Sequence, residues 1–290
     1  MQLERIVSPD VVRGLVLPSR GSFLMNDERI EAILSAVKGP DILSLGCVGH
    51  TLPSTEQETV HWLQLHLQQR FPQASILGLD IDQANVERMH SMGFKAELGD
   101  AHHLTFESQF DTIVLGELIE HLESPGECLA GCKRALKPGG RIVISTPNAF
   151  SVMLGLMYLK NFDKAFNAEH VLWFCPQTLR TVLARCGLDL VQLEFVDNLA
   201  PELISAKSYR AFAYSWRGIR RLLPKRYRNT MVAVCQSAEI PACRESRPPA
   251  PSIAQHSGSR CAPPLAISAC ENSSPESSRS KKVNPRAVAR

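Results

Sequence analysis

The chain has 290 residues, long enough for one sizeable domain with appendages, and its 44% hydrophobic and 21% charged residues are typical of a globular protein. The net charge of +3 is too small to indicate a nucleic-acid-binding protein. From Gln236 onward eight Lys/Arg stand against four Asp/Glu, so the rest of the chain is slightly acidic. The basic character therefore belongs to the C-terminal segment.

Nine cysteines, an odd number, are scattered without the CxxC or Cys/His spacing of a metal finger. No signal peptide is recognisable, and no apolar run reaches the roughly 18 residues that span a bilayer. Together these features predict reduced thiols and a cytoplasmic location.

In chain order, apolar runs with the length of strands alternate with segments of helical period. The strands are predicted at 41–45, 75–81, 94–98, 112–115, 141–145, 188–195 and 230–235. The helices are predicted at 27–38, about 54–70, 83–91, 124–136 and 176–186. Ser124-Pro125-Gly126-Glu127 has the cap, proline and acid of a helix start, and Lys137-Pro138-Gly139-Gly140 is predicted as the turn after that helix.

This alternation predicts an α/β fold, a doubly wound, mostly parallel, seven-stranded sheet with helices on both faces. The predicted organisation is an N-terminal arm and helix (1–38), a central domain (39–235) and a disordered tail (236–290) that lacks aromatic residues. Within the central domain, insertions at about 148–175 and 198–228 are expected to cover the substrate.

The strand at 112–115 leads through Gly116 into a cluster of ionisable side chains. These are Glu117, Glu120, His121 and Glu123. Open α/β sheets bind their ligands beyond the carboxyl ends of the strands, so this cluster is predicted to form the floor of an active site.

Four landmarks follow the first four strands in order: the glycine loop at 45–50, Asp80, Asp100 and the Gly116–His121 segment. With E-x-x-E-H at 117–121, T-P-N at 146–148 and E-H before an aromatic residue at 169–170, the chain resembles class I S-adenosylmethionine-dependent methyltransferases. Within them it is similar to the branch of the ubiquinone-biosynthesis-type O-methyltransferases. The resemblance covers about residues 40–235 and implies a methyltransferase of the same fold.

The resemblance implies that S-adenosylmethionine lies against the carboxyl ends of the first strands. The cofactor-binding residues that it implies are Gly46, Cys47, Gly49, Asp80, Ile81, Asp100, Ala101 and Glu117. Asp80 would accept both ribose hydroxyls, and Asp100 would accept from the adenine amino group. Each has a structural alternative: Asp80 can cap the next helix, and Asp100 can be a turn residue. The pair His102–His103 is interpreted as surface.

The glycine loop departs from the family pattern D-x-G-x-G-x-G. Ser44 stands at the acidic position, Val48 at the middle glycine and His50 at the last one. Losing the acid removes a partner for the methionyl end of the cofactor, and Val48 restricts the turn. These changes leave open a degenerate methyltransferase fold that binds a ligand or partner without turnover.

Methyl transfer from a sulfonium needs alignment of donor and acceptor, and a base only where a hydroxyl must lose its proton. His121 and His170 are the candidate catalytic bases, because imidazoles titrate near neutral pH. The resemblance also implies an alternative, in which Glu117, Glu120, His121 and His170 bind a divalent metal such as Mg²⁺ beside the acceptor hydroxyl. In the remaining alternative, Glu120 and His121 cap and pack the strand end.

The acceptor is expected to be a hydroxylated small molecule, sugar-like or lipid-linked, and an RNA 2′-O-methyltransferase is the weaker alternative. Val152–Leu159 is apolar and is predicted to form a lid helix. Within 207–228, Phe212, Trp216, Ile219 and Leu223 fall at helical spacing among arginines. This stretch can pack onto the domain, bind an anionic substrate or lie on a membrane surface. Nothing in the sequence indicates an oligomeric state.

Overall fold

The structure is a computed structural model of the chain, and it describes residues 28–49, 62–160, 169–197, 215–216 and 218–238. Its centre is a seven-stranded sheet with the order β3-β2-β1-β4-β5-β7-β6. The strands are β1 (Asp41–Leu45), β2 (Ser75–Asp80), β3 (Ala96–Leu98), β4 (Phe110–Gly116), β5 (Leu136–Pro147), β6 (Leu188–Val196) and β7 (Thr230–Ser237). The first five strands pair in parallel, whereas β7 pairs antiparallel with both β5 and β6. The predicted doubly wound, mostly parallel α/β fold is therefore confirmed.

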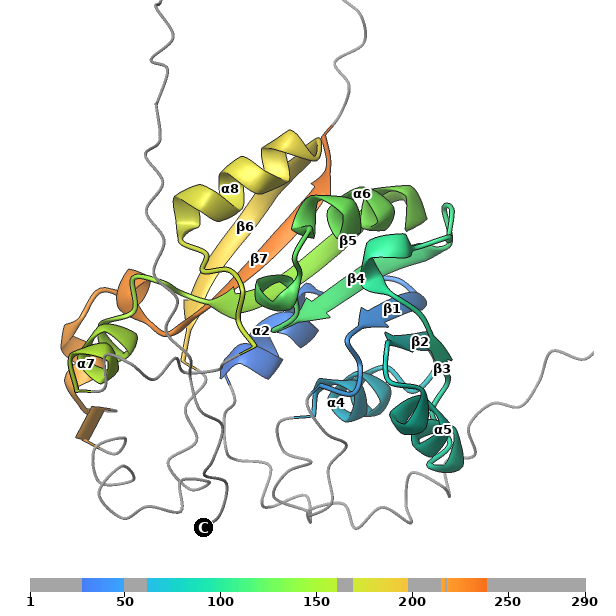
Figure 1. The fold of residues 1–290 in the computed structure, drawn as a ribbon, viewed down its shortest axis with the longest axis horizontal. Coiled ribbons are helices and arrows are strands. Elements are labelled where there is room, and N and C mark those ends of the chain that lie inside the picture. Colours follow the sequence, from blue (N-terminus) through green and yellow to red (C-terminus); the bar gives the residue numbers. More distant parts are fainter. Residues whose placement is uncertain (1–27, 50–61, 161–168, 198–214, 217, 239–290) are drawn as a thin grey trace, which may run out of the picture. The chain divides into compact units, whose positions relative to one another are not determined.

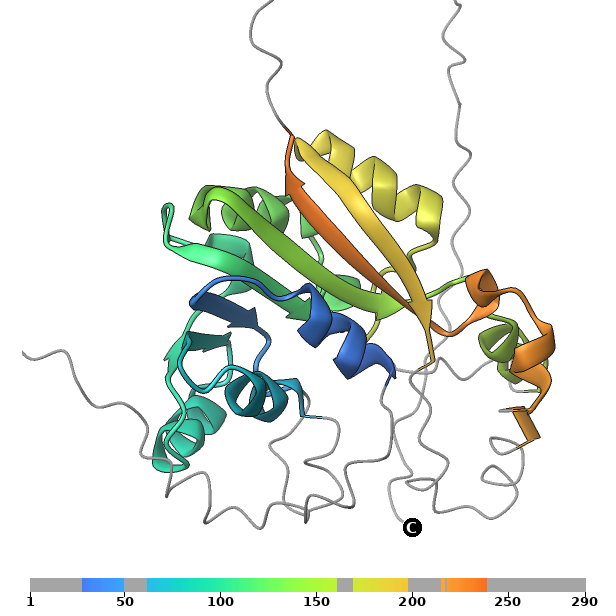
Figure 2. The same cartoon turned by 180° about the vertical axis from the view of Figure 1, so that it is seen from behind.

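Helices cover both faces of this sheet, as the two opposite views show (Figures 1 and 2). They are α2 (Glu28–Ala36), α4 (Leu63–Arg70), α5 (Gln83–Ser91), α6 (Pro125–Ala135), α7 (Val152–Lys160) and α8 (Pro176–Arg185). α6 and α8 pack on one face, and α2 and α4 pack on the other. No helix among the described residues is long and apolar enough to cross a membrane.

The strands alternate their side chains between two apolar layers, which is why the run Ile113–Leu115 of β4 is apolar at every position. Ile113 and Leu115 of β4 belong to the cluster that contains α6 and α8. Val114, between them, belongs to the cluster built with Ile33 of α2. All three β4 side chains are 0% exposed. A central strand buried on both faces holds its carboxyl end, where the polar cluster begins, in a rigid position.

The predicted elements agree with the described ones except at their ends. The predicted turn at 137–140 lies inside β5: the register with β4 jumps from the pair Phe110–Leu136 to the pair Thr112–Arg141, so these residues form a bulge. β7 extends to Ser237, two residues into the predicted tail. The N-terminal arm, the first part of the helix predicted from Ser54 and the tail from residue 239 lie outside the described residues.

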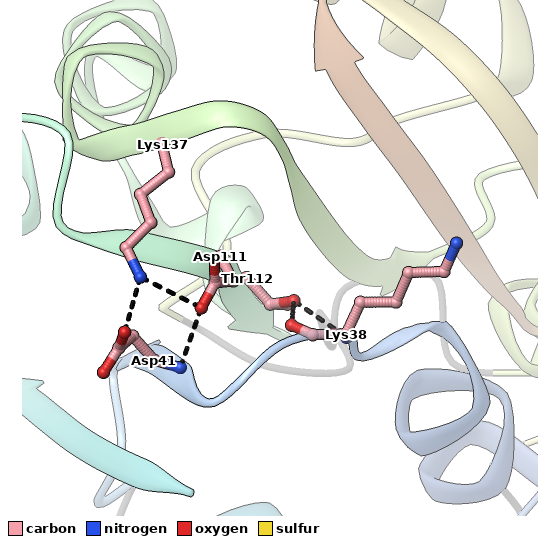
Figure 3. A network of polar contacts seen from close by, with 5 residues as sticks. All are labelled: Lys38, Asp41, Asp111, Thr112 and Lys137. Atoms are coloured by element: carbon pink, nitrogen blue, oxygen red, sulfur yellow. Dashed lines mark hydrogen bonds and ion pairs between the residues drawn. The ribbon is translucent and has the colours of Figure 1, made fainter.

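A network of polar contacts ties the loop before β1 to β4 and to the β5 bulge (Figure 3). Lys137 Nζ donates to Asp41 Oδ2 and, at 3.1 Å, to Asp111 Oδ2, which also accepts the Asp41 N–H at 3.0 Å. Beside it, Thr112 Oγ1 accepts the Lys38 N–H at 3.0 Å and donates to the Lys38 carbonyl at 2.6 Å. These contacts lie at the amino ends of β1 and β4, so they hold the sheet at the edge opposite the polar cluster.

Candidate cofactor and active site

A cavity of about 760 Å³ lies at the carboxyl ends of β1, β2 and β4. Its lining includes every predicted cofactor-binding residue and both candidate bases: Gly46, Cys47, Gly49, Asp80, Ile81, Asp100, Ala101, Glu117, His121 and His170. Glu123 does not line the cavity and is exposed, which removes it from the predicted cluster. The sequence landmarks therefore meet around a single space large enough for a nucleoside-sized ligand.

The glycine loop after β1 accommodates Val48 without strain. Its two left-handed positions are Gly46 and Gly49, with φ of +63° and +71°, while Val48 is not among the residues with positive φ. The Val48 side chain is 2% exposed and packs in an apolar cluster with Trp62 and Leu65. At Gly49 an added Cβ would meet no atom of the described residues within 4 Å, so these residues leave the backbone there open to a ligand. The predicted restriction of the turn by Val48 is not what the structure shows, because glycine stands where positive φ is required. His50 lies outside the described residues.

Asp80 ends β2 and anchors the glycine loop. Its Oδ2 accepts the Val48 N–H at 2.9 Å, and its Oδ1 accepts the Asp82 N–H at 3.2 Å. The helix cap is Asp82, whose side chain accepts the Asn85 N–H at the start of α5, so the capping role considered for Asp80 belongs to its neighbour. A carboxylate has about four acceptor sites, and two backbone bonds leave Asp80 able to accept hydroxyl groups as well.

Cys47 contributes its backbone to the cavity and its side chain to the core. The thiol is in contact with the Met89 sulfur at 3.6 Å, and burial raises its pKa to about 12. Its carbonyl accepts the Trp62 indole N–H at 2.8 Å, which links the glycine loop to the start of α4. The Cys47 thiol is therefore neutral, and its part in a cofactor site is limited to main-chain atoms.

Asp100 caps the short 3₁₀ turn Ala101–His103 and lines the cavity, so both predicted roles coincide at one residue. Its Oδ1 accepts the His102 N–H at 2.9 Å and contacts the His102 ring Nδ1 at 2.7 Å. The backbone bond from His102 is the largest cause that lowers the pKa of Asp100. His102 also lines the cavity, so interpreting it as a surface residue was wrong. The adjacent His103 is largely exposed, as was predicted for both.

Two polar side chains of the cavity escaped the sequence interpretation. Arg29 of α2 is only 6% exposed, and Gln64 of α4 is 1% exposed. Among the described residues, neither Oε1 nor Nε2 of Gln64 has a hydrogen-bond partner. Arg29 stands four residues before Ile33 on the apolar stripe of its helix, a position from which its burial could have been predicted. The sequence around Gln64, which lies between Leu63 and Leu65, did not indicate that this side chain is buried.

The two candidate bases lie in contact, although 49 positions separate them in the chain. The rings of His121 and His170 are perpendicular, at 89°, with centroids 4.7 Å apart. His121 ends the 3₁₀ turn Ile119–His121, and the Glu120 carbonyl of that turn accepts the N–H groups of Val171 and Leu172 at 3.0 and 3.1 Å. Main-chain bonds thus bring the distant E-H motif to the end of β4.

The two glutamates of the predicted set lie in different environments. Glu117 is one of two described non-glycine residues with positive φ, at +54°, and its N–H is held by the Ser145 carbonyl and hydroxyl at 3.0 and 3.1 Å. Such a conformation costs about 1–3 kcal/mol and is typical of functional sites. Glu120 is 1% exposed and accepts the Thr146 hydroxyl at 2.9 Å. Burial, with the Glu117 charge as a second cause, raises the pKa of Glu120 to about 8.

Three of the four predicted metal ligands come together. Glu120, His121 and His170 each offer a ligand atom, and these atoms all lie within 4.8 Å of one another. Glu117 is not part of this group of described residues, so the predicted four-ligand set is reduced to three. Two imidazoles and one carboxylate suit a divalent ion, but the carboxylate must first lose its proton.

The fold and the cavity define the class of protein, and comparisons with known proteins agree. Residues 24–193 match a family model described as a methyltransferase domain. The chain is 25% identical over 166 residues to the ubiquinone biosynthesis O-methyltransferase of Azoarcus sp. and 28% identical over 167 residues to that of Dinoroseobacter shibae. Each alignment covers 53% of this chain, and they cover 66% and 62% of the two relatives, just under two thirds of their length.

A solved structure of a SAM-dependent methyltransferase from Archaeoglobus fulgidus has the same fold, with a TM-score of 0.50 and 20% identity. The match covers 74% of this chain and 95% of that one. The chain therefore has the fold of the class I S-adenosylmethionine-dependent methyltransferases. It belongs to the methyltransferase-domain family whose model it matches.

Proposed function

We propose that the protein transfers a methyl group from S-adenosylmethionine to a hydroxyl oxygen. The observation that carries this proposal is the meeting of Asp80, Asp100 and the His121–His170 pair around one cavity at the carboxyl edge of the sheet. Cofactor-binding and proton-accepting groups then share one space, as an O-methyltransferase requires. The names of the two bacterial relatives support the same reaction type.

The residues present fit the cofactor. Asp80 has acceptor capacity left for the ribose hydroxyls, and Asp100 lies beside the short turn that would border the adenine. At the other end, Arg29 offers a cation to a zwitterionic methionyl group, and Gln64 offers an amide that has no hydrogen-bond partner among the described residues; Ser44 replaces the family's acid. When bound, the cofactor supplies an electrophilic methyl group on a sulfonium.

The chemistry left to the protein is orientation and proton removal. Holding the acceptor oxygen in line with the methyl group contributes about 7–11 kcal/mol to such reactions. One imidazole of the His121–His170 pair would take the proton of the acceptor hydroxyl, and the perpendicular contact with the other ring would fix its orientation. The Glu120 carbonyl, which accepts the N–H groups of Val171 and Leu172, holds the segment that follows His170 beside the turn that carries His121.

Binding of the cofactor distinguishes this proposal from a degenerate fold without turnover. Calorimetric titration with S-adenosylmethionine and S-adenosylhomocysteine is expected to give micromolar affinity for both. If neither ligand gave heat at concentrations well above micromolar, the proposal that the protein is a methyltransferase would be contradicted. Heat with both ligands but no methyl transfer to any hydroxylated acceptor would favour the non-catalytic alternative.

Replacing Gln64 by Leu is expected to weaken S-adenosylmethionine binding by about tenfold, because the variant cannot form the hydrogen bonds proposed between the Gln64 amide and the methionyl group. The unfolding free energy is expected to stay the same or to rise, since the amide of Gln64 has no partner among the described residues. Calorimetry and chemical denaturation measure the two quantities. A loss of stability without a loss of affinity would show that Gln64 serves the fold alone.

Replacing by Ala the residue of the His121–His170 pair that acts as the base is expected to lower kcat by about 10²–10⁴-fold, and replacing the other is expected to lower it less. The affinity for S-adenosylmethionine is expected to stay nearly constant in both variants, because a base acts only on the acceptor. Turnover is measured with an acceptor from a screen of hydroxylated aromatics, sugars and lipid-linked phenols. The matched control is His90→Ala on α5, whose ring contacts the Ala96 carbonyl outside the cavity and whose kcat is expected to be unchanged. Unchanged kcat in both His121→Ala and His170→Ala would contradict the role of the pair.

A divalent cation is the second candidate for activating the acceptor, favoured by the convergence of Glu120, His121 and His170. A bound cation would lower the pKa of the acceptor hydroxyl and orient it. If a metal is used, turnover falls in chelator and returns with Mg²⁺, whereas a base mechanism leaves turnover unchanged. An RNA 2′-O-methyltransferase would instead methylate RNA in the same assay, and the slightly acidic main part of the chain disfavours that substrate.

A further inference from the structure

Five of the nine large hydrophobic side chains that are exposed among the described residues lie on two short segments. Phe150, Leu156 and Leu159 lie on or just before α7 and are 65%, 43% and 84% exposed. Ile219 and Leu222, at 49% and 85%, lie in the segment before β7. Exposed apolar side chains that gather in this way mark an interaction surface rather than ordinary scatter. We call the described residues of these two segments, 150–160, 215–216 and 218–226, the apolar–basic patch.

The two segments form one region of the surface. Asn148, at the end of β5, is 0% exposed and donates its side-chain N–H groups to the carbonyls of Arg226 and Arg228 at 2.9 and 2.8 Å. Its backbone N–H donates to the Asn229 carbonyl at 2.8 Å. Both views show α7 beside the orange segment that precedes β7 (Figures 1 and 2). A buried asparagine therefore clamps the loop after β5 to the loop before β7.

Positive charge accompanies the apolar side chains. Arg221, Lys225 and Arg226 are exposed, and neither 148–160 nor 215–229 contains an Asp or Glu. The helical spacing of Trp216, Ile219 and Leu223 does not place all three side chains in one environment. Trp216 is 3% exposed and anchors the segment, whereas Ile219 faces solvent; Phe212 lies outside the described residues. The exposed apolar side chains thus share their two segments with cations and with no acidic residue.

We propose that the apolar–basic patch docks the protein on an anionic lipid bilayer. Aliphatic side chains enter the interface between headgroups and acyl chains, while lysine and arginine interact with lipid phosphates. A second copy of the chain fits worse, because two such patches repel each other. Nucleic acid fits worse, because Phe150 is the single aromatic residue among the five exposed apolar side chains and aliphatic groups do not stack on bases.

The patch and the cavity belong to the same edge of the sheet. β5 runs parallel to β4 and ends at Pro147, which pairs with Thr230 at the start of β7. The patch therefore begins at the carboxyl edge, where the cavity lies. Docking there would bring this edge towards the bilayer, where a lipid-linked acceptor would be found. The docking itself does not depend on the proposed methyl transfer.

Cosedimentation of the full chain with vesicles tests the proposal. Vesicles of phosphatidylcholine with phosphatidylglycerol are expected to bind the protein, and vesicles of phosphatidylcholine alone are expected to bind it at least about tenfold more weakly. The double variants Leu159→Asp/Leu222→Asp and Arg221→Glu/Lys225→Glu are each expected to lose at least about tenfold in partitioning onto the anionic vesicles. The C-terminal basic segment is unchanged in both, so the difference reports the patch.

The matched control is Val191→Asp/Leu98→Asp, which adds the same two negative charges as Leu159→Asp/Leu222→Asp, at residues of β6 and β3 that are 60% and 53% exposed. Its partitioning is expected to equal that of the wild type, and circular dichroism verifies that all variants are folded. The proposal is overturned if the wild type does not bind anionic vesicles, or if both double variants bind as the wild type does. It is also overturned if a single-stranded RNA displaces the protein from vesicles and the patch variants lose RNA binding instead.

Discussion

Asp80→Asn is expected to weaken S-adenosylmethionine binding by at least about 100-fold, the largest loss among single substitutions in the cavity. Each Asp80 oxygen accepts a backbone N–H, one from Val48 and one from Asp82. An amide presents NH₂ at one of these positions, so a donor faces a donor, and the glycine loop loses its anchor. The charge-assisted bonds proposed for the ribose hydroxyls are lost as well, at about 1.5–3 kcal/mol each. Calorimetric titration measures the affinity.

Asp82→Asn is the matched control for this prediction. Asp82 is exposed, does not line the cavity and caps α5 through the Asn85 N–H. Asparagine caps helices about as well as aspartate, so the affinity for S-adenosylmethionine is expected to stay within about twofold of the wild type. Thermal melting verifies that Asp80→Asn is folded. Equal losses in the two variants would show that Asp80 acts through the general charge of the loop and not through its bonds.

Gly39→Ala is expected to lower the free energy of unfolding by at least about 3 kcal/mol, the largest effect on stability outside the apolar core. Gly39 has φ of +77°, and an added Cβ would overlap the side chain of Asp111. Asp111 cannot retreat without losing the Asp41 N–H and the Lys137 ammonium, which it holds in the network of Figure 3. Left-handed backbone strain of about 1–2 kcal/mol therefore adds to the loss of that network. Denaturant unfolding measures the change.

Gly126→Ala supplies the control for Gly39→Ala. Gly126 lies in the first turn of α6, has no positive φ, and an added Cβ would meet nothing within 4 Å. Because alanine favours the helix, this variant is expected to be as stable as the wild type or up to about 1 kcal/mol more stable. If Gly39→Ala unfolded at the same denaturant concentration as Gly126→Ala, the steric role of Asp111 would be refuted.

Much of the fold could be predicted from the sequence because its determinants are local. The apolar run at 112–115, the stop at Gly39 and the helix start at Ser124 each depend on a few neighbouring residues, and the corresponding elements are present. The bulge at 137–140 and the antiparallel direction of β7 could not be predicted. Both depend on pairing with strands distant in sequence, to which no local pattern refers.

Some residues of the candidate site could likewise be predicted from the sequence, and others could not. Asp80 and Asp100 were found because they follow predicted strands, and parallel strands bring their carboxyl ends to one edge. Arg29, Gln64 and His102 were missed, because a polar residue on a helix or turn reveals neither its burial nor the cavity that it lines. Burial is a property of the packed chain, so these side chains could be assigned to the cavity only in the folded structure.

The sequence alone determined the α/β architecture, the methyltransferase resemblance and the position of the polar cluster after the central strand. Only the tertiary structure decided that His170 reaches His121, that Glu117 is not among the three residues whose ligand atoms lie within 4.8 Å of one another, and that Val48 is compatible with the glycine loop. The physical reason is the range of the interactions. The residue pattern that marks a strand or a helix is carried by residues close in sequence, whereas a site is assembled by contacts between distant residues, such as the main-chain bonds from Val171 and Leu172 to Glu120.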